Sequence, residues 1–202
     1  MIDSVSKLVN NSSRHNNPIK ASKVSFLVLL CVSSLCLVGV QQVFAQSSIT
    51  ETVYIQSNGN IYSSTNSSVP LEQNGNVYTF TDDMSVYSFV VQRSDIIIDG
   101  AGFSLQGEGE VAIDITSVGG VTIQNLDILG GFNYGIYITQ SSFNTIVDNT
   151  ISGNGVGIRV YNSTQNTLTG NTIENNNMGL ELWLTSENLM QNNVLDNFRN
   201  LA

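Results

Sequence analysis

The sequence predicts an all-β protein, a right-handed parallel β-helix built from coils of about 22 residues. Three observations lead to this fold class. From residue 121 onward, side chains recur every 22 residues, with one step of 23. Apolar and polar residues alternate within each repeat, and Gly and Asn interrupt the alternation every few residues. Period-2 alternation indicates short strands with one buried face, whereas helical repeats would need a spacing near 3.6.

Four apolar columns and two asparagine columns have this period. Stacking equivalent strands about 4.8 Å apart would bury the apolar columns in one continuous core. The columns are Ile123/Ile146/Leu168/Met190, Ile128/Ile151/Ile173/Leu195, Ile136/Ile158/Leu180, Ile138/Val160/Leu182, Asn144/Asn166/Asn188 and Asn149/Asn171/Asn193.

The second asparagine column is expected to point inward at a bend, because Phe103 and Leu126 occupy the equivalent positions in earlier coils. Stacked amides at such a place would hydrogen-bond along the column and satisfy the backbone groups of the turns. We therefore expect a structural role for these asparagines.

The N-terminal part, residues 1–45, has the pattern of a leader. Lys20 and Lys23 precede an apolar run over residues 24–40. A cut after Ala45 would place side chains of small or moderate size, Val43 and Ala45, at positions −3 and −1. This pattern indicates a secretory signal peptide, with an uncleaved anchor helix as the alternative. The only cysteines and the only histidine all precede the cut: Cys31, Cys36 and His15.

Residues 46–93 are expected to form cap strands that cover the first coil, and residues 94–202 the coils themselves. Asn74-Gly75 is a hairpin signal within the cap. No matching cap is expected at the other end, where Ala202 aligns with Leu180 and a strand would only begin. This pattern indicates a truncated C-terminal end, and the uncapped C-terminal coil is a candidate for self-association.

Charge excludes one class of partner. After residue 45 the chain has fifteen carboxylates, three arginines and no lysine, a net charge of about −12. Nucleic-acid backbones are bound through clustered Lys and Arg, so nucleic-acid binding is excluded. A membrane contact is expected only through the N-terminal segment.

The motif Asn-Thr-Ile-x-x-Asn-x-Ile followed by Gly-Ile-x-Val, at 144–160, resembles the repeats of the pectin-lyase-like superfamily, and more closely the NosD-type β-helix proteins. Residues 96–103 are similar to the opening coil of that family, and residues 74–80 to its lead-in strand. The resemblance implies the fold and a surface or periplasmic location. It does not choose an activity, because the superfamily holds lyases, hydrolases, epimerases and proteins without catalytic activity.

One outward patch is a candidate glycan-binding surface. Strand alternation places two outward columns side by side, and together they offer aromatic rings and both signs of charge, as saccharide sites do. The alternative is ordinary cross-strand pairing, with Arg159 bridging Glu181 and Tyr161 stacking on Trp183. The candidate residues are Tyr137, Arg159, Tyr161, Glu181 and Trp183.

Catalytic and metal sites find little support. Glu174 and Asp196 form a candidate carboxylate pair, one coil apart, for calcium or for glycosidic acid–base chemistry, but only Ser152 and Leu129 extend their column. The adjacent Asp82-Asp83 is expected to be a turn. Copper would need His, Cys or clustered Met, which residues 46–202 lack, so no metal or other cofactor is predicted.

The predicted function is a secreted or cell-surface β-helix without catalytic activity that binds polysaccharide or cell-envelope glycan, or serves as an adhesion or envelope scaffold. The alternative is a carbohydrate-active enzyme, a polysaccharide lyase or glycoside hydrolase, whose catalytic groove is incomplete in this chain. Tethering by an uncleaved N-terminal helix is the second expectation for location. Asn66 and Asn162 begin sequons and are candidate glycosylation sites.

Overall fold

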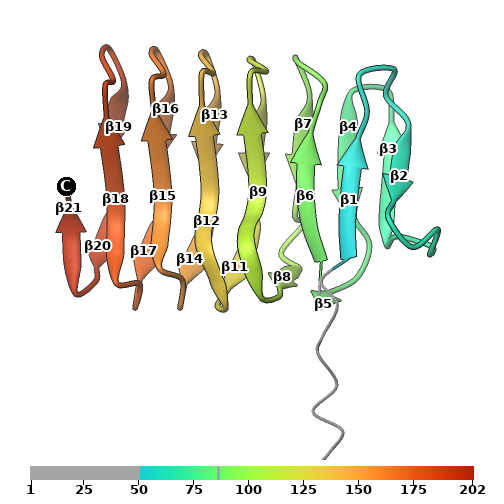
Figure 1. The fold of residues 1–202 in the computed structure, drawn as a ribbon, viewed down its shortest axis with the longest axis horizontal. Coiled ribbons are helices and arrows are strands. Elements are labelled where there is room, and N and C mark those ends of the chain that lie inside the picture. The colour runs from blue at the N-terminus through green and yellow to red at the C-terminus, as the bar shows by residue number, and fades with distance from the viewer. Residues whose placement is uncertain (1–50, 86) are drawn as a thin grey trace, which may run out of the picture. The chain divides into compact units, whose positions relative to one another are not determined.

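A computed structural model describes residues 51–85 and 87–202, which form a parallel β-helix (Figure 1). These residues contain strands and turns and no α-helix. Three sheets run along the solenoid, and each coil contributes one short strand to each sheet. The predicted fold class is therefore confirmed.

The first sheet has eight strands and includes the longest strands of the fold. In spatial order they are β2 (Ile61–Ser63), β1 (Glu51–Ile55), β6 (Tyr87–Val91), β9 (Gly109–Thr116), β12 (Phe132–Thr139), β15 (Val156–Tyr161), β18 (Met178–Trp183) and β21 (Arg199–Leu201).

The second sheet has seven strands and the third has six. The second consists of β19 (Leu189–Gln191), β16 (Thr167–Thr169), β13 (Thr145–Val147), β10 (Thr122–Gln124), β7 (Ile97–Asp99), β4 (Val77–Phe80) and β3 (Leu71–Asn74). The third consists of β20 (Val194–Asp196), β17 (Thr172–Glu174), β14 (Thr150–Ser152), β11 (Asp127–Leu129), β8 (Ser104–Gln106) and β5 (Met84–Ser85).

The predicted apolar columns stack in register. Ile151 lies opposite Ile173, which lies opposite Leu195, and the other three columns pair in the same way. Their central members are fully buried and form one core that extends through the coils. The alternation in the sequence thus predicted which face of each strand is inside.

Antiparallel pairing occurs only at the start of the described chain. β1 pairs with β2, and β3 pairs with β4 around a turn at Gly75, whose φ is +63°. The hairpin expected at Asn74-Gly75 is confirmed. Parallel stacking already includes β4, β5 and β6, which pair with β7, β8 and β9.

The last coil has a register that differs from the prediction. Leu201, rather than Ala202, lies opposite Leu180, and β21 already pairs with β18. The reason is that the last turn is one residue shorter: Asn176 and Asn197 are 21 residues apart, whereas the other ladder steps are 22. Several apolar side chains of this coil are exposed, including Val194 and Phe198.

The asparagine columns form ladders of hydrogen bonds inside the turns. In the second column the Asn149 side-chain amide donates to Asn171 Oδ1 at 3.0 Å, and Asn171 donates to Asn193 Oδ1 at 3.0 Å. Each Oδ1 also accepts the backbone N–H of the preceding asparagine in the column. Asn149 and Asn171 are buried, which confirms their predicted inward position.

A third ladder, which the sequence analysis did not identify, passes through Asn154, Asn176 and Asn197. The Asn176 amide donates to Asn197 Oδ1 at 2.9 Å, and the Asn154 backbone N–H donates to Asn176 Oδ1 at 2.8 Å. The 22-residue spacing of Asn154 and Asn176 was the available signal. Three such ladders hold neighbouring coils together at their bends.

Candidate functional site

The candidate site lies on the outer face of the eight-stranded sheet. Register places Asp114, Tyr137, Arg159 and Glu181 in one outward row. A second row beside it contains Tyr161 opposite Trp183. The two outward columns expected from strand alternation are therefore present as neighbours.

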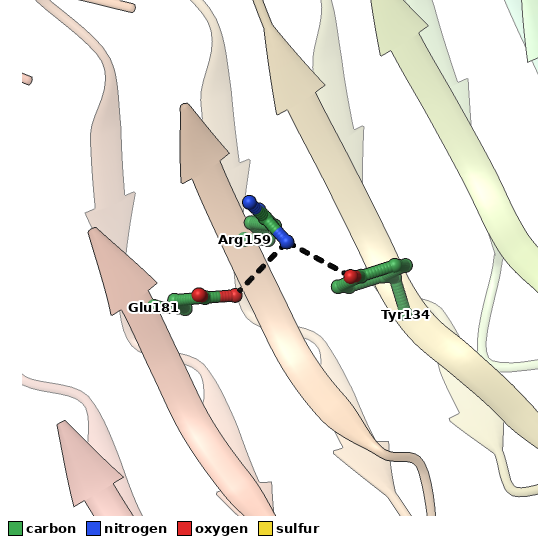
Figure 2. Close-up of polar contacts among 3 residues, drawn as sticks. All are labelled: Tyr134, Arg159 and Glu181. Carbon is green, nitrogen blue, oxygen red and sulfur yellow. Dashed lines mark hydrogen bonds and ion pairs between the residues drawn. The ribbon is translucent and has the colours of Figure 1, made fainter. Parts of the chain in front are cut away.

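Arg159 is at the centre of this face, on β15. Its Nη1 donates to the Tyr134 hydroxyl at 2.8 Å and lies 3.4 Å from Glu181 Oε2. Figure 2 shows the guanidinium between these two groups, which project from the strands on either side. The predicted bridge between Arg159 and Glu181 is thus formed, with both side chains about 20% exposed.

Three tyrosine rings surround the guanidinium. Its central carbon lies 5.4 Å from the ring centroid of Tyr134, 5.8 Å from that of Tyr137 and 5.6 Å from that of Tyr161. These distances lie within the range of cation–π attraction, which strengthens when the partners are partly removed from water. We call Tyr134, Tyr137, Arg159, Tyr161 and Glu181 the arginine cluster.

One donor of the arginine cluster has no partner. Arg159 Nε is buried and makes no hydrogen bond to the described residues. The guanidinium is nonetheless held by Tyr134 from β12 on one side and by Glu181 from β18 on the other. The cluster therefore presents a fixed cation with adjacent aromatic faces.

Trp183 extends the cluster toward the end of β18 and is 56% exposed. Its ring meets Tyr161 edge-on, with centroids 6.5 Å apart and an interplanar angle of 78°. The expected stacking of these two rings is therefore wrong. In an edge-to-face contact Tyr161 can cover at most one face of the Trp183 ring, so the other face is available.

Tyr134 was missing from the sequence-based candidates. It lies outside the strict alternation because Gly135 and Ile136 are both buried, so the outward positions on β12 are separated by three residues instead of two. The same break in the alternation recurs in β9 and β15, so Tyr134 stays in register with Val111 and Val156, and its hydroxyl reaches Arg159. The Gly-Ile pairs at 135–136 and 157–158, one coil apart, were the available signal.

The two carboxylates of the predicted pair, Glu174 and Asp196, lie directly opposite each other on β17 and β20. Ser152 precedes them in the same column, as expected. They belong to the six-stranded sheet, whereas Arg159 belongs to the eight-stranded sheet. Glu174 and Asp196 are therefore not brought together with Arg159 on one face.

Asp82 and Asp83 shape a turn next to the first coils. Asp83 Oδ1 accepts the backbone N–H of Ser104 at 2.8 Å and the Ser104 hydroxyl at 3.0 Å. Asp82 Oδ1 accepts the N–H of Asp83. These contacts agree with the turn role predicted for the two residues.

Both sequon asparagines lie in exposed turns. Asn66 and Asn162 have positive φ angles of 58° and 46°. Next to Asn162, the Ser163 side chain is buried and donates to Tyr161 O at 2.7 Å. Glycosylation at these positions stays a prediction.

These features define a class: a parallel β-helix repeat protein whose coils are joined by asparagine ladders and whose longest sheet has an aromatic, mixed-charge outer face. The family model for NosD, described as periplasmic copper-binding protein, matches residues 9–202. The chain belongs to the NosD family. Comparisons with curated proteins and with solved structures give no match.

The residues described by the structure do not fit a copper site. Copper prefers imidazole, thiolate or thioether ligands. His15, Cys31 and Cys36 lie outside the described residues, as do the predicted leader, its cut and the alternative anchor helix. Met84, Met178 and Met190 belong to three different sheets, and Met84 is buried in the core.

Acidic groups do not supply a metal site in this part of the chain either. Residues 51–85 and 87–202 contain no group of three or more His, Cys, Asp or Glu side chains arranged to hold a metal ion. The same residues include no helix with the length and hydropathy needed to cross a bilayer.

Proposed function

We propose that this NosD-family protein acts outside the cytoplasm as a glycan-binding β-helix without catalytic activity. The family description, a periplasmic protein, supports the location. The observation that carries the binding role is the arginine cluster, in which one guanidinium contacts three tyrosine rings beside an exposed tryptophan.

The chemistry of the cluster suits a saccharide. Aromatic faces cover the C–H faces of sugar rings, while guanidinium, carboxylate and phenol groups exchange hydrogen bonds with hydroxyls. Arg159 and Glu181 provide the charged groups, and Tyr134 and Tyr161 provide both ring faces and hydroxyls. An ion pair with a purely structural role would not need a large exposed tryptophan beside it.

The linear form of the site supports a polymer as ligand. Equivalent outward residues repeat from strand to strand at about 4.8 Å. From Tyr54 on β1 to Glu181 on β18, the outward row crosses six strands in register, a length of about 24 Å. A row of this length can contact several consecutive sugar units of one chain.

The test is binding of the full chain to a panel of immobilised polysaccharides, followed by titration with the polysaccharide that is retained. The double variant Tyr161→Ala/Trp183→Ala should weaken binding at least tenfold, because it removes the exposed tryptophan and the half-buried tyrosine ring beside it. Phe143→Ala is the matched control, since Phe143 is an aromatic residue with 65% exposure in a turn away from the row.

Two outcomes would refute the proposal. One is failure of the wild-type protein to retain any polysaccharide of the panel. The other is unchanged affinity of the double variant, with circular dichroism showing that both proteins are folded.

A further inference from the structure

A second feature of the same outer face is a groove beside the arginine cluster. It has a volume of about 420 Å³ and is open to solvent. Its walls come from β1, β6 and β9, and its polar lining includes Thr52, Tyr54, Ser88, Glu110 and Asp114. Asp114 is the direct neighbour of Tyr137 in the outward row, so the groove and the cluster are continuous.

The groove arises because β9 separates from β6. Only two residue pairs join these strands, Phe89 with Ile113 and Val90 with Asp114. On its other edge β9 pairs with β12 from Gly109 to Thr116, so its first half follows β12 without pairing with β6. Figure 1 shows the lower part of β9 bending away from β6. Buried Phe89 forms the floor of the space that opens between the two strands.

The groove is anionic as well as aromatic. Glu108, Glu110 and Asp114 line it, and no lysine or arginine does. Two of these carboxylates accept hydrogen bonds from neutral groups: the Asn133 amide donates to Glu110 Oε2 at 2.7 Å, and the Thr116 hydroxyl donates to Asp114. Neutral donors orient a carboxylate without cancelling its charge, so the groove favours a cation.

The aromatic wall is held in place. The Tyr54 ring packs against Tyr62 with centroids 5.8 Å apart, and the hydroxyls of Thr52 and Ser88 lie 3.3 Å from each other beside it. A ring face with adjacent hydroxyls and carboxylates can contact the C–H face, the hydroxyls and a protonated amine of one sugar unit.

We infer that this groove is a subsite for an amino sugar with a free, protonated amino group, within a glycan that continues onto the arginine cluster. The inference rests on the proposed function and adds to it the chemical class of the sugar. The ammonium group would lie between Glu110 and Asp114, with the sugar ring against Tyr54.

The experiment compares two oligosaccharides that differ only in the amine. The full-length protein is titrated calorimetrically with a glucosamine hexamer and with its fully N-acetylated counterpart, at a pH where the free amines are protonated. We expect the free-amine hexamer to bind at least tenfold more tightly than the acetylated one. Raising the salt concentration should reduce this preference, because the groove is exposed.

The variant Glu110→Gln/Asp114→Asn should abolish the preference, so that the two hexamers bind with equal affinity. Glu174→Gln/Asp196→Asn is the matched control, since it removes the same charge from the six-stranded sheet. It should keep the preference.

Equal affinity of the wild-type protein for the two hexamers, no binding of the free-amine hexamer, or loss of the preference in the control variant would each overturn the inference. Binding of polysaccharide that depends on Trp183 but not on free amines would leave the proposed function intact. The two failures are therefore distinguishable.

Discussion

The replacement Asn171→Ala tests whether the asparagine ladders hold the coils together. The Asn171 side chain is fully buried. Its Oδ1 accepts the backbone N–H of Asn149 at 3.1 Å and the Asn149 amide at 3.0 Å. Its Nδ2 donates to Ile146 O at 2.8 Å and to Asn193 Oδ1 at 3.0 Å. Alanine would remove all four hydrogen bonds.

The cost follows from the groups left behind. The N–H of Asn149 and the carbonyl of Ile146 would lose these partners inside the solenoid, and an unsatisfied buried group costs about 1–3 kcal/mol. We expect the free energy of unfolding to fall by roughly 2–6 kcal/mol. Urea denaturation followed by far-ultraviolet circular dichroism measures it.

Asn177→Ala is the control, because Asn177 is exposed and lies one residue past the neighbouring ladder. Its effect should stay within about 0.5 kcal/mol, as for most surface substitutions. A fall of less than about 1 kcal/mol for Asn171→Ala would refute the reasoning, since even one orphaned buried group should cost that much.

Three further changes have defined outcomes. Gly157→Ala should destabilise the fold by about 1–3 kcal/mol in urea denaturation, because a Cβ there would lie 2.6 Å from Ile173 Cγ2 and 2.8 Å from Gly179 O. Arg159→Met and Glu181→Gln, combined in a double-mutant cycle, should give a coupling of no more than about 1 kcal/mol, because the pair is partly exposed; a larger value would indicate a structural ion pair rather than a binding surface. For Asp99, burial raises the carboxyl pKa, but hydrogen bonds from the Ala101 N–H and the side chains of Gln124 and Asn125 outweigh it and hold the pKa below its usual value. The stabilisation by the ionised carboxylate is present above about pH 4 and is lost as pH falls through the lowered pKa. When the free energy of unfolding is measured against pH, it should therefore fall less in acid for Asp99→Asn than for the wild type. Identical curves would contradict this.

The sequence predicted the stacked core because the register between coils of a solenoid follows from the spacing of residues along the chain. Residues such as Ile151 and Ile173 recur at the length of one coil, so their spacing alone places them one above the other. The same spacing predicted Arg159 beside Glu181.

The groove and Tyr134 did not follow from the coil spacing and a strict two-residue alternation. Tyr134 turns outward where Gly135 and Ile136 interrupt the alternation. The groove depends on how far β9 follows β6, which only two register pairs determine. Ring orientation also has no periodic signal, which is why Trp183 was expected to stack on Tyr161.

The asparagines of the second ladder begin at Asn149 for a physical reason that the sequence pattern alone did not show. Leu126 precedes Asn149 in this column, and its N–H donates to Asn149 Oδ1. No amide is needed at position 126 itself, because the N–H of Phe103 already donates to Gly100 O at 2.8 Å. An asparagine becomes necessary only where the coil before it presents a free backbone donor.

The parallel strand pairs connect each coil only with the coils immediately before and after it. Duplicating an internal segment of 22 residues, such as 154–175, would therefore repeat the same contacts without disturbing the rest of the solenoid. Each copy would add one rung to every ladder and lengthen the outer face by about 4.8 Å. In this architecture the reach of a binding surface can change by gene duplication in steps of one coil, while the stability of each step is preserved.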